Sequence, residues 1–568
     1  MTDARWDHVV DVLVVGSGAG GLAAAITAAR NGADVEVIEK APQLGGTSAW
    51  SGGMPWVPRN SHMPEVGVPD SREDALTYID SLLNDRSPDH DLVELYVDRA
   101  AEAWDYIEAN SAIEMVVTYS YSDYYADRPG GKPRGRSLEP KPFDSPKMLG
   151  EWHDRVRDTP HIPRLTQDEM AAEGARRNLP VGAEGAVPVD IMALLGEREA
   201  NGIRTLGPAL VSGLVRGALD AGVSLQTGTP ATELVVDDGA VVGVVAEHDG
   251  QTIRIGARRG VVLASGGFEW NAELVRAYMG IPDAFPLTPP TNVGDGLQMG
   301  LEVGAAVGNM TNAVAFPAAY DGHSTNEAGG PLGSLAPPRS DKGCIIVNRD
   351  GRRFVNEGVS YMDMAKSHRQ YDQDTATYPN TGPVWQIFDQ DVRERTMTLD
   401  FVPGQPTPDW VHEAATVAEL AAKIGVDPAI LAEQVERFNA AAEAGVDPDF
   451  HRGTIWWEGY QTGGPSPEKN MAKIERGPFY AMKLYNGVLG TLGGLRIDEH
   501  AQVRAARGGL VDGLYAVGNV AAGIFGQAYP GGGSTLGPNV TFGYLAGLHA
   551  AARSARDVEP AREAVAQS

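Results

Sequence analysis

The N-terminal segment constrains the fold of this chain more than any other part. An apolar run leads into the glycine-rich turn 16–21, an alanine-rich run, and a second apolar run that ends at Glu39. Gly16 permits a tight turn after a strand, Gly18 lets the backbone approach a pyrophosphate, and Gly21 lets a helix pack closely. The segment therefore predicts a strand–helix–strand unit that binds a dinucleotide at the helix N-terminus.

This segment has two other interpretations. One is an ordinary glycine-rich turn in an α/β domain, and the other is a signal peptide or membrane span, since 9–29 carries a single charge, Asp11. The central glycines, the acidic residues Asp3 and Asp7, and the lack of a basic start argue against both. The motif alone leaves NAD and FAD equally open.

Size and charge narrow the class of protein. A chain of 568 residues is too long for one core, so we expect two or more domains. The net charge of −28 argues against nucleic acid and anionic membranes as partners. No other stretch is long and apolar enough to be a transmembrane segment, so a cytoplasmic protein is expected.

Cysteine and histidine offer no metal or disulfide framework. The single cysteine, Cys344, lies in an apolar run and is expected to be a small buried core residue. The histidines are scattered, and His368 and His451 are interpreted as structural or surface residues. No metal site is predicted.

Glycine motifs at both ends of the chain suggest one domain interrupted by another. Residues 1–311 and 485–568 are expected to form a nucleotide-binding domain. Residues 312–484 are expected to form an inserted α+β domain, which includes helical stretches at 417–424 and 428–445. The polar segment at about 150–205 is interpreted as an insertion or mobile flap.

Several motifs along nearly the whole chain resemble those of one flavoprotein group. They are 45–49 (GGTSA), 122–125 (SDYY), 135–140 (GRSLEP), 353–357 (RFVNE), 446–453 (VDPDFHRG), 477–481 (GPFYA) and 529–533 (YPGGG). The chain is similar to fumarate reductase/succinate dehydrogenase-like flavoproteins, and within them to the 3-ketosteroid Δ1-dehydrogenases. This resemblance implies an α/β fold with a Rossmann-like FAD-binding domain, an inserted α+β catalytic domain, and non-covalent FAD.

The glycine motifs, together with the resemblance, predict a set of FAD-binding residues. These are Gly16, Ser17, Gly18, Gly20, Gly21, Glu39, Lys40, Gly45, Gly46, Thr47, Ser48, Gly266, Gly267, Asp295, Gly518, Asn519 and Leu536. Glu39 is expected to accept hydrogen bonds from ribose hydroxyls.

Three departures from the fumarate reductases bear on the substrate. Tyr361 stands where they carry an arginine after Asn-Glu, Gly490 stands in place of a histidine, and Thr535 replaces a second arginine. Those cations would hold a dicarboxylate and donate a proton. Their absence favours a neutral ketone with a large apolar body.

The resemblance assigns catalytic roles to four residues. In a Δ1-dehydrogenation a hydride leaves C1 and a proton leaves C2 of a 3-ketosteroid. The Tyr529 hydroxyl and the Gly533 N–H are expected to polarise the C3 carbonyl, as oxyanion donors do. Tyr361 is the expected base and Tyr124 its hydrogen-bonding partner. Because phenol has an ordinary pKa of roughly 10, such a base needs its phenolate stabilised.

Rival assignments exist for these positions. Tyr125 is the nearest alternative to Tyr124, and Tyr121 and Tyr119 are weaker ones. Any tyrosine taken alone is more often a packing residue than a catalytic one. Three further side chains are expected either to line an apolar slot for the substrate or to belong to the core: Phe316, Met362 and Phe525.

These observations predict an FAD-dependent oxidoreductase that acts on CH–CH groups, a 3-ketosteroid Δ1-dehydrogenase of steroid catabolism, with a quinone-like electron acceptor. Alternatives are desaturation at the Δ4-(5α) position or of a non-steroidal cyclic ketone, reduction of an enoate or enone, and a flavin-binding sensor without turnover. The sequence makes no prediction of the oligomeric state.

Overall fold

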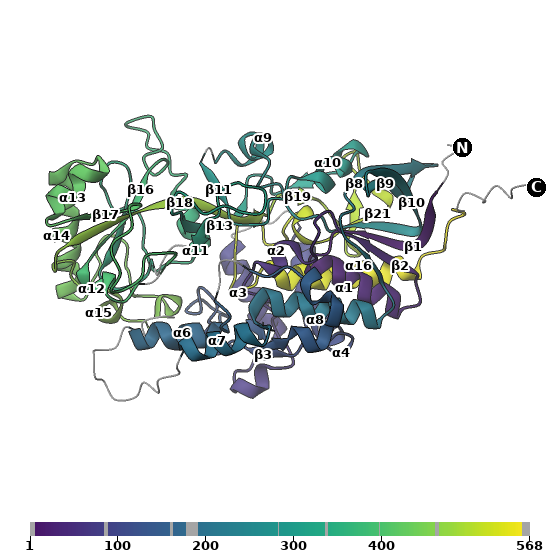
Figure 1. Cartoon of the computed structure of the whole chain (residues 1–568), viewed down its shortest axis with the longest axis horizontal. Coiled ribbons are helices and arrows are strands. Elements are labelled where there is room, and N and C mark those ends of the chain that lie inside the picture. Colours follow the sequence, from purple (N-terminus) through teal and green to yellow (C-terminus); the bar gives the residue numbers. More distant parts are fainter. Residues whose placement is uncertain are drawn as a thin grey trace, which may run out of the picture.

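The computed structural model describes residues 6–83, 89–159, 163–177, 191–281, 283–335, 339–396, 398–459 and 465–558. It has a mixed α/β fold with two large sheets that follow one another along the long axis (Figure 1). The first sheet lies at the end that carries both chain termini, and the second lies at the opposite end beside α13 and α14.

The first sheet runs in the order β20-β21-β9-β10-β1-β2-β7, with β8 paired to β9. Within it, β21, β10, β1, β2 and β7 pair in parallel, so strands from both ends of the chain share one sheet. Its strands are β1 (His8–Val15), β2 (Val35–Ile38), β7 (Ser224–Gln226), β8 (Ala231–Asp237), β9 (Ala240–His248), β10 (Gln251–Leu263), β20 (Gln502–Arg504) and β21 (Leu510–Ala516).

The topology of this sheet sets where a ligand can bind. Carboxyl ends of parallel strands meet at one edge, so the turns that follow β1, β2, β10 and β21 converge there. The strands β8 and β9, expected from the Asp-Gly turns, form an antiparallel pair, and β9 pairs antiparallel with the first half of β10. The second half of β10 pairs in parallel with β1 and β21. The residues after the converging strands include the predicted glycine motifs.

Helices α1 and α16 pack against each other along one face of the first sheet (Figure 1). Small residues permit this close approach: a Cβ on Gly543 would lie 2.3 Å from the carbonyl oxygen of Gly20. The helices of the first part of the chain are α1 (Ala19–Arg30), α2 (Gly46–Ala49), α3 (Arg72–Leu83), α4 (His90–Ala109), α5 (Ser145–Leu149), α6 (Gln167–Arg177), α7 (Ile191–Ala200), α8 (Leu206–Asp220), α9 (Ala272–Leu274) and α10 (Asp295–Glu302); α16 is Leu536–Ala552.

The second sheet runs β14-β13-β18-β16-β15, and β11 and β17 also pair with the long β18. Cys344 is fully buried in β15, as expected. Because β11 precedes residue 312, this sheet takes a strand from the N-terminal side of the expected boundary. Its strands are β11 (Ala284–Pro286), β13 (Ala313–Ala319), β14 (Ser334–Leu335), β15 (Cys344–Val347), β16 (Val384–Asp389), β17 (Val411–Ala414) and β18 (Phe479–Thr491).

Helices α13 and α14 form where the sequence predicts them. Thr416 and Glu419 make a reciprocal capping box at the start of α13, and Asp427 caps α14 ahead of Pro428. The helices of this part are α11 (Tyr361–Ser367), α12 (Gln390–Arg393), α13 (Val417–Ile424), α14 (Pro428–Ala444) and α15 (Pro467–Asn470). Three small two-stranded sheets complete the fold: β3 (Met115–Val117) with β4 (Leu138–Pro140), β5 (Phe143–Asp144) with β6 (Ile203–Arg204), and β12 (Val307–Gly308) with β19 (Gly494–Leu495).

Within the segment 150–205, residues 160–162 and 178–190 lie outside the described residues. Near its two ends, the described part of the segment packs against the rest of the protein. Arg204 is 4% exposed and donates to the carbonyl oxygen of Val156 at 3.0 Å. Val156 in turn forms a bridge with Leu44, beside the predicted glycine motif.

Candidate active site

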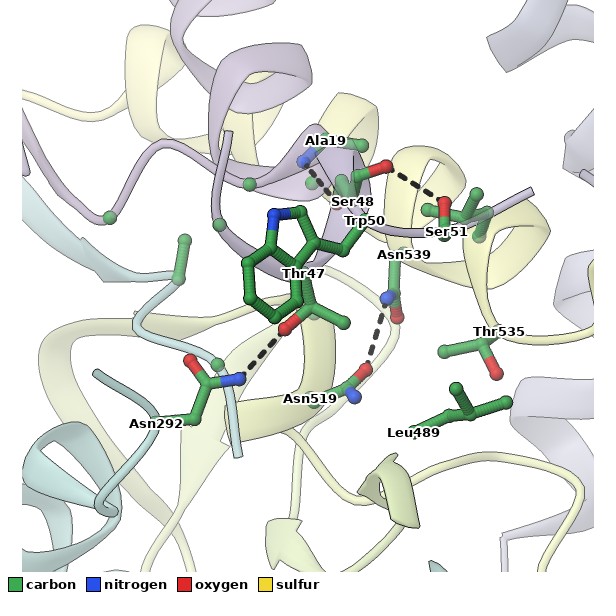
Figure 2. A pocket seen from close by; sticks show the side chains of 18 of the residues that line it. Ala19, Thr47, Ser48, Trp50, Ser51, Asn292, Leu489, Asn519, Thr535 and Asn539 are labelled. Carbon is green, nitrogen blue, oxygen red and sulfur yellow. Dashed lines mark hydrogen bonds between the residues drawn. The ribbon is translucent and has the colours of Figure 1, made fainter. Parts of the chain in front are cut away.

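A cavity opens at the carboxyl edge of the first sheet and extends to the second. Its walls include Gly16 and Gly518 from the first sheet, Phe316 and Leu489 from the second, and Tyr361 at the start of α11. Figure 2 shows the part of this wall formed by Thr47, Trp50 and the neighbouring polar side chains. The cavity therefore brings the predicted nucleotide motif and the predicted catalytic segment into one space.

The N-terminus of α1 faces this cavity, and its first N–H, that of Ala19, donates to Ser48 Oγ at 3.0 Å (Figure 2). Gly16 has φ +108°, and a Cβ there would lie 2.4 Å from the carbonyl oxygen of Ala264, so only glycine fits the turn. Gly18 is the N-cap residue and makes no side-chain capping bond. A Cβ on Gly18 would meet only Ser48 Oγ, at 3.6 Å. The open space beside Gly18 and the positive end of the helix dipole fit a pyrophosphate.

Glu39 lies in the cavity wall and is held in place from both sides. Its carboxylate accepts hydrogen bonds from the Ser17 N–H at 3.0 Å, the Ser17 hydroxyl at 2.6 Å and the Ala41 N–H at 2.9 Å. Next to it, Lys40 forms an ion pair with Asp295 at 2.8 Å. An oriented carboxylate at the end of β2 suits the ribose of a dinucleotide.

Polar side chains from distant segments complete the cofactor half of the cavity (Figure 2). The Asn292 amide donates to Thr47 Oγ1 at 2.7 Å, and the Asn539 amide donates to Asn519 Oδ1 at 3.3 Å. Ser265 also lines the cavity, and its buried hydroxyl has no hydrogen-bond partner within the described chain. Unsatisfied buried donors of this kind fit a large polar ligand such as FAD.

Nearly all predicted cofactor residues line the cavity, with two exceptions. Gly45 lies behind the wall, where its N–H donates to Ser17 Oγ at 2.9 Å. Gly267 packs against Glu269 and Thr491, each 2.4 Å from the position of an added Cβ. Sequence reasoning missed a further group of lining residues, for which composition and spacing gave no signal: Trp50, Ser265, Asn292 and Asn539.

The predicted catalytic tyrosines meet in one aromatic cluster. The ring centroids of Tyr124 and Tyr361 are 5.6 Å apart, those of Tyr361 and Tyr529 are 5.9 Å apart, and those of Tyr124 and Tyr529 are 6.0 Å apart. Tyr361 and Tyr529 line the cavity, whereas Tyr124 lies behind them and is fully buried. The Tyr124 hydroxyl makes no hydrogen bond of regular geometry within the described residues, although it is near enough to Tyr361 to affect the pKa of that phenol. Only the tertiary fold places these three residues together.

Burial dominates the ionisation of this cluster. It raises the pKa of Tyr361 well above its ordinary value, nearby Tyr529 adds to the rise, and the Tyr124 hydroxyl opposes it. Burial also raises the pKa of Tyr124 well above normal. All three phenols are thus favoured in their neutral, donating form, and a base among them needs a further group that stabilises negative charge.

Tyr529 and Gly533 converge on one point of the wall. Burial raises the pKa of Tyr529, while the hydroxyls of Thr535 and Tyr361 and the backbone N–H groups of Thr535 and Gly533 lower it. Gly533 has φ +100°, and a Cβ there would lie 2.4 Å from the carbonyl oxygen of Met54. Its own carbonyl accepts from the Trp56 N–H at 3.1 Å. This pairing fixes the direction of the residue's backbone.

The rival residues occupy different places. The Tyr125 hydroxyl donates to Asp363, and Tyr119 is 58% exposed. Phe525 packs edge-on against Trp56 and Tyr96, which makes it a core residue. Met362 is buried in the tyrosine cluster without lining the cavity. Of the remaining candidates, Tyr121 and Phe316 line the cavity, and so does Gln167 of α6, which the sequence did not single out.

The described residues contain neither a membrane-spanning helix nor a metal-binding cluster. No helix among them is long and apolar enough to cross a membrane. In the same residues, no group of three or more His, Cys, Asp and Glu side chains is arranged to hold a metal ion.

The fold and the cavity define an FAD-binding flavoprotein, and the family model described as "FAD binding domain" matches residues 11–536 of this chain. The 3-oxosteroid 1-dehydrogenase of Mycolicibacterium smegmatis is 37% identical over 96% of this chain and 98% of its own length. The chain belongs to the 3-ketosteroid Δ1-dehydrogenase family of FAD-binding proteins.

Two further similarities bear on the substrate. The 4-oxocyclohexanecarboxylate 2-dehydrogenase of Sinomonas cyclohexanicum is 38% identical over 96% of this chain and 93% of its own length. The crystal structure of the 3-ketosteroid Δ1-dehydrogenase from Sterolibacterium denitrificans, in complex with 1,4-androstadiene-3,17-dione, has a TM-score of 0.85. The two chains are 34% identical, and the match covers 96% of this chain and 99% of the Sterolibacterium chain.

Proposed function

We propose that this protein is an FAD-dependent 3-ketosteroid Δ1-dehydrogenase. The observation that carries the proposal is the meeting of Tyr361, Tyr529 and Gly533 in the wall of the cofactor cavity, with Tyr124 directly behind. The names of the relatives in Mycolicibacterium and Sterolibacterium support the same activity.

The chain's own residues account for the acid–base half of the reaction. The Tyr529 hydroxyl and the Gly533 N–H would donate to the C3 oxygen of the substrate as negative charge develops there. Tyr361 would take the proton from C2: the C2–H bond breaks, a phenol O–H forms, and the electron pair enters an enolate. This pair then forms the C1–C2 double bond as the hydride leaves C1.

FAD, when bound, supplies the acceptor for that hydride. Gly18 and the α1 N-terminus would hold its pyrophosphate, and Glu39 its ribose. Asn292, Thr47 and Ser265 offer polar atoms along the rest of the cavity. These residues would hold the cofactor in the same cavity that Tyr361 and Tyr529 line.

We also propose the finer division of the chain. Residues 1–311 and 485–568 form a Rossmann-like FAD-binding domain, and 312–484 form an inserted substrate domain. The parallel strands shared by both chain ends support the first part, and the separate sheet around β18 supports the second. The strand β11 favours a start of the second sheet before residue 312.

A non-steroidal cyclic ketone is the second candidate, favoured by the similarity to the Sinomonas enzyme. That enzyme's named substrate carries a carboxylate. Among the described residues that line the cavity, Lys40 is the one cation, and it is paired with Asp295 at the cofactor end. Because a buried carboxylate needs a cationic or multiple hydrogen-bonding partner, the described wall favours a neutral, apolar substrate.

The same argument weighs against a dicarboxylate reductase. Thr535 lines the cavity where fumarate reductases carry arginine, and its hydroxyl donates to Tyr529 at 3.3 Å. At Gly490, in place of their histidine, an added Cβ would lie 2.3 Å from the Asn519 amide nitrogen. This wall therefore has no room for the histidine without a shift of Asn519.

One anaerobic experiment separates these functions. The purified flavoprotein is mixed with a 3-keto-4-ene steroid, with 4-oxocyclohexanecarboxylate, or with succinate, and the flavin absorbance is followed. We expect bleaching with the steroid and a 1,4-diene product by mass spectrometry. Bleaching with 4-oxocyclohexanecarboxylate alone would replace the proposal with the second candidate. Reoxidation with quinone-like acceptors then tests the proposed electron acceptor.

A further inference from the structure

A buried arginine outside the cavity lining stands out beside the tyrosine cluster. Arg339 is 6% exposed, and its guanidinium lies 5.7 Å from the centroid of the Phe316 ring. The other neighbour of that ring is Tyr361, with centroids 4.9 Å apart. Phe316 therefore neighbours both a buried cation and the proposed base.

Arg339 lacks the partner that a buried cation ordinarily has. No carboxylate of the described residues lies within ion-pair distance of it, and its guanidinium donates to the backbone carbonyl oxygen of Glu357. The Glu357 carboxylate is already engaged by Arg353 at 2.7 Å and Arg452 at 3.1 Å. A guanidinium without a counter-ion is costly to bury, so a nearby anion would stabilise it.

The groups that can supply this anion are the tyrosines. Burial lowers the pKa of Arg339 to about 10, and negative charge on Tyr124 and Tyr361 raises it again. Because opposite charges attract, a buried guanidinium that shares the Phe316 ring with Tyr361 favours negative charge on that phenol over the neutral form. The other titratable groups with the largest effect on these residues are Tyr121 and Tyr529 beside the phenols, and Arg452 and Cys344 beside the guanidinium.

We propose that Arg339 is the buried counter-ion of the Tyr361–Tyr124 pair, a positioning residue that favours the phenolate of the base. The proposal rests on the proposed function in that Tyr361 takes the C2 proton. It answers the difficulty set by the burial of Tyr361, which by itself favours the neutral phenol. In the transfer, the proton moves to Tyr361 while Arg339 keeps its charge throughout.

The test removes the charge but keeps the hydrogen bond. Arg339→Gln retains an N–H donor for the Glu357 carbonyl, and Arg339→Lys retains the charge. Arg369→Met is the control. Arg369 lies just after α11, and its guanidinium also donates to a backbone carbonyl oxygen, that of Thr311 at 2.7 Å. Only burial shifts the pKa of Arg369, so no tyrosine is coupled to it.

The readout is the pH dependence of flavin bleaching by a 3-keto-4-ene steroid in anaerobic single turnover. Loss of one unit charge near the base should raise the apparent pKa of the rising limb by about one unit or more in Arg339→Gln. The rate at neutral pH should fall about 10- to 100-fold. Arg339→Lys should restore the wild-type midpoint, and Arg369→Met should match wild type.

A merely structural arginine would lower the rate equally at every pH and leave the midpoint unmoved. That result, or an equal shift in Arg339→Lys and Arg339→Gln, would overturn the proposal. A second readout needs no turnover. The tyrosinate absorbance of each holoenzyme is titrated with pH, and the titration of its Tyr361→Phe counterpart is subtracted, which leaves the signal of Tyr361. We expect the midpoint of this titration to rise in Arg339→Gln. If wild type fails to bleach with steroid, the proposed function fails, while this titration still decides the role of Arg339.

Discussion

Replacing Tyr529 with phenylalanine tests the proposed oxyanion donor directly. The change removes one hydroxyl and keeps the ring, so the contacts with Tyr124 and Tyr361, at 6.0 and 5.9 Å between centroids, are retained. The Thr535 hydroxyl loses an acceptor 3.3 Å away, which should cost about 1 kcal/mol of stability. The fold and the bound flavin should therefore survive.

The expected effect on the reaction is much larger than the effect on stability. A donor aimed at a developing oxyanion contributes about 3 kcal/mol to the transition state, or roughly 100- to 1000-fold in rate. Since this charge is absent from the bound ketone, kcat should fall far more than KM rises. The backbone N–H of Gly533 remains as the second donor, so some activity should persist.

Anaerobic stopped-flow mixing with a 3-keto-4-ene steroid measures the rate constant for flavin bleaching. Tyr125→Phe is the control, because its hydroxyl bonds to Asp363 and lies outside the cavity lining. We expect Tyr125→Phe to resemble wild type. A rate constant for Tyr529→Phe within about threefold of wild type, at equal flavin content, would refute the role of Tyr529.

Three further changes test other parts of the site. Gly533→Ala should lower the bleaching rate, and it should lower the unfolding free energy measured in denaturant by about 2 kcal/mol or more. The reason is that the new Cβ would lie 2.4 Å from the Met54 carbonyl oxygen at φ +100°. Wild-type rate and stability would contradict this geometry. Gly18→Val should fold, since φ −64° and ψ 168° suit valine, but lose most of its flavin absorbance; full flavin content would exclude Gly18 from the pyrophosphate site. Burial raises the pKa of Glu139 to about 7, so the folded state binds its proton more tightly and stability falls as pH rises from about 4.5 to 7. Glu139→Gln should therefore gain up to about 3 kcal/mol relative to wild type between pH 5 and pH 8 in denaturant unfolding, and a constant difference would disprove the shift.

Local chemistry explains why most of the residues predicted to bind the cofactor line one cavity. The turn after β1, the carboxylate after β2 and the glycines after β10 and β21 each require particular residues at short spacing. Most of the residues named on this basis line the cavity, among them Gly16, Glu39 and Gly518. The capping residues Thr416 and Asp427 likewise mark helices α13 and α14 by local hydrogen bonding alone.

Contacts between segments far apart in the chain decided the rest. The sequence named Tyr124, Tyr361 and Tyr529 through motif resemblance, but only the fold shows that Tyr124 stands behind the other two, without a hydrogen bond of regular geometry in the described residues. Nothing in the local sequence marks Arg339 as buried and unpaired, since that depends on Arg353 and Arg452 occupying Glu357. A spacing rule reports what neighbouring residues can do together, whereas burial and charge pairing are set by every segment that packs around a group.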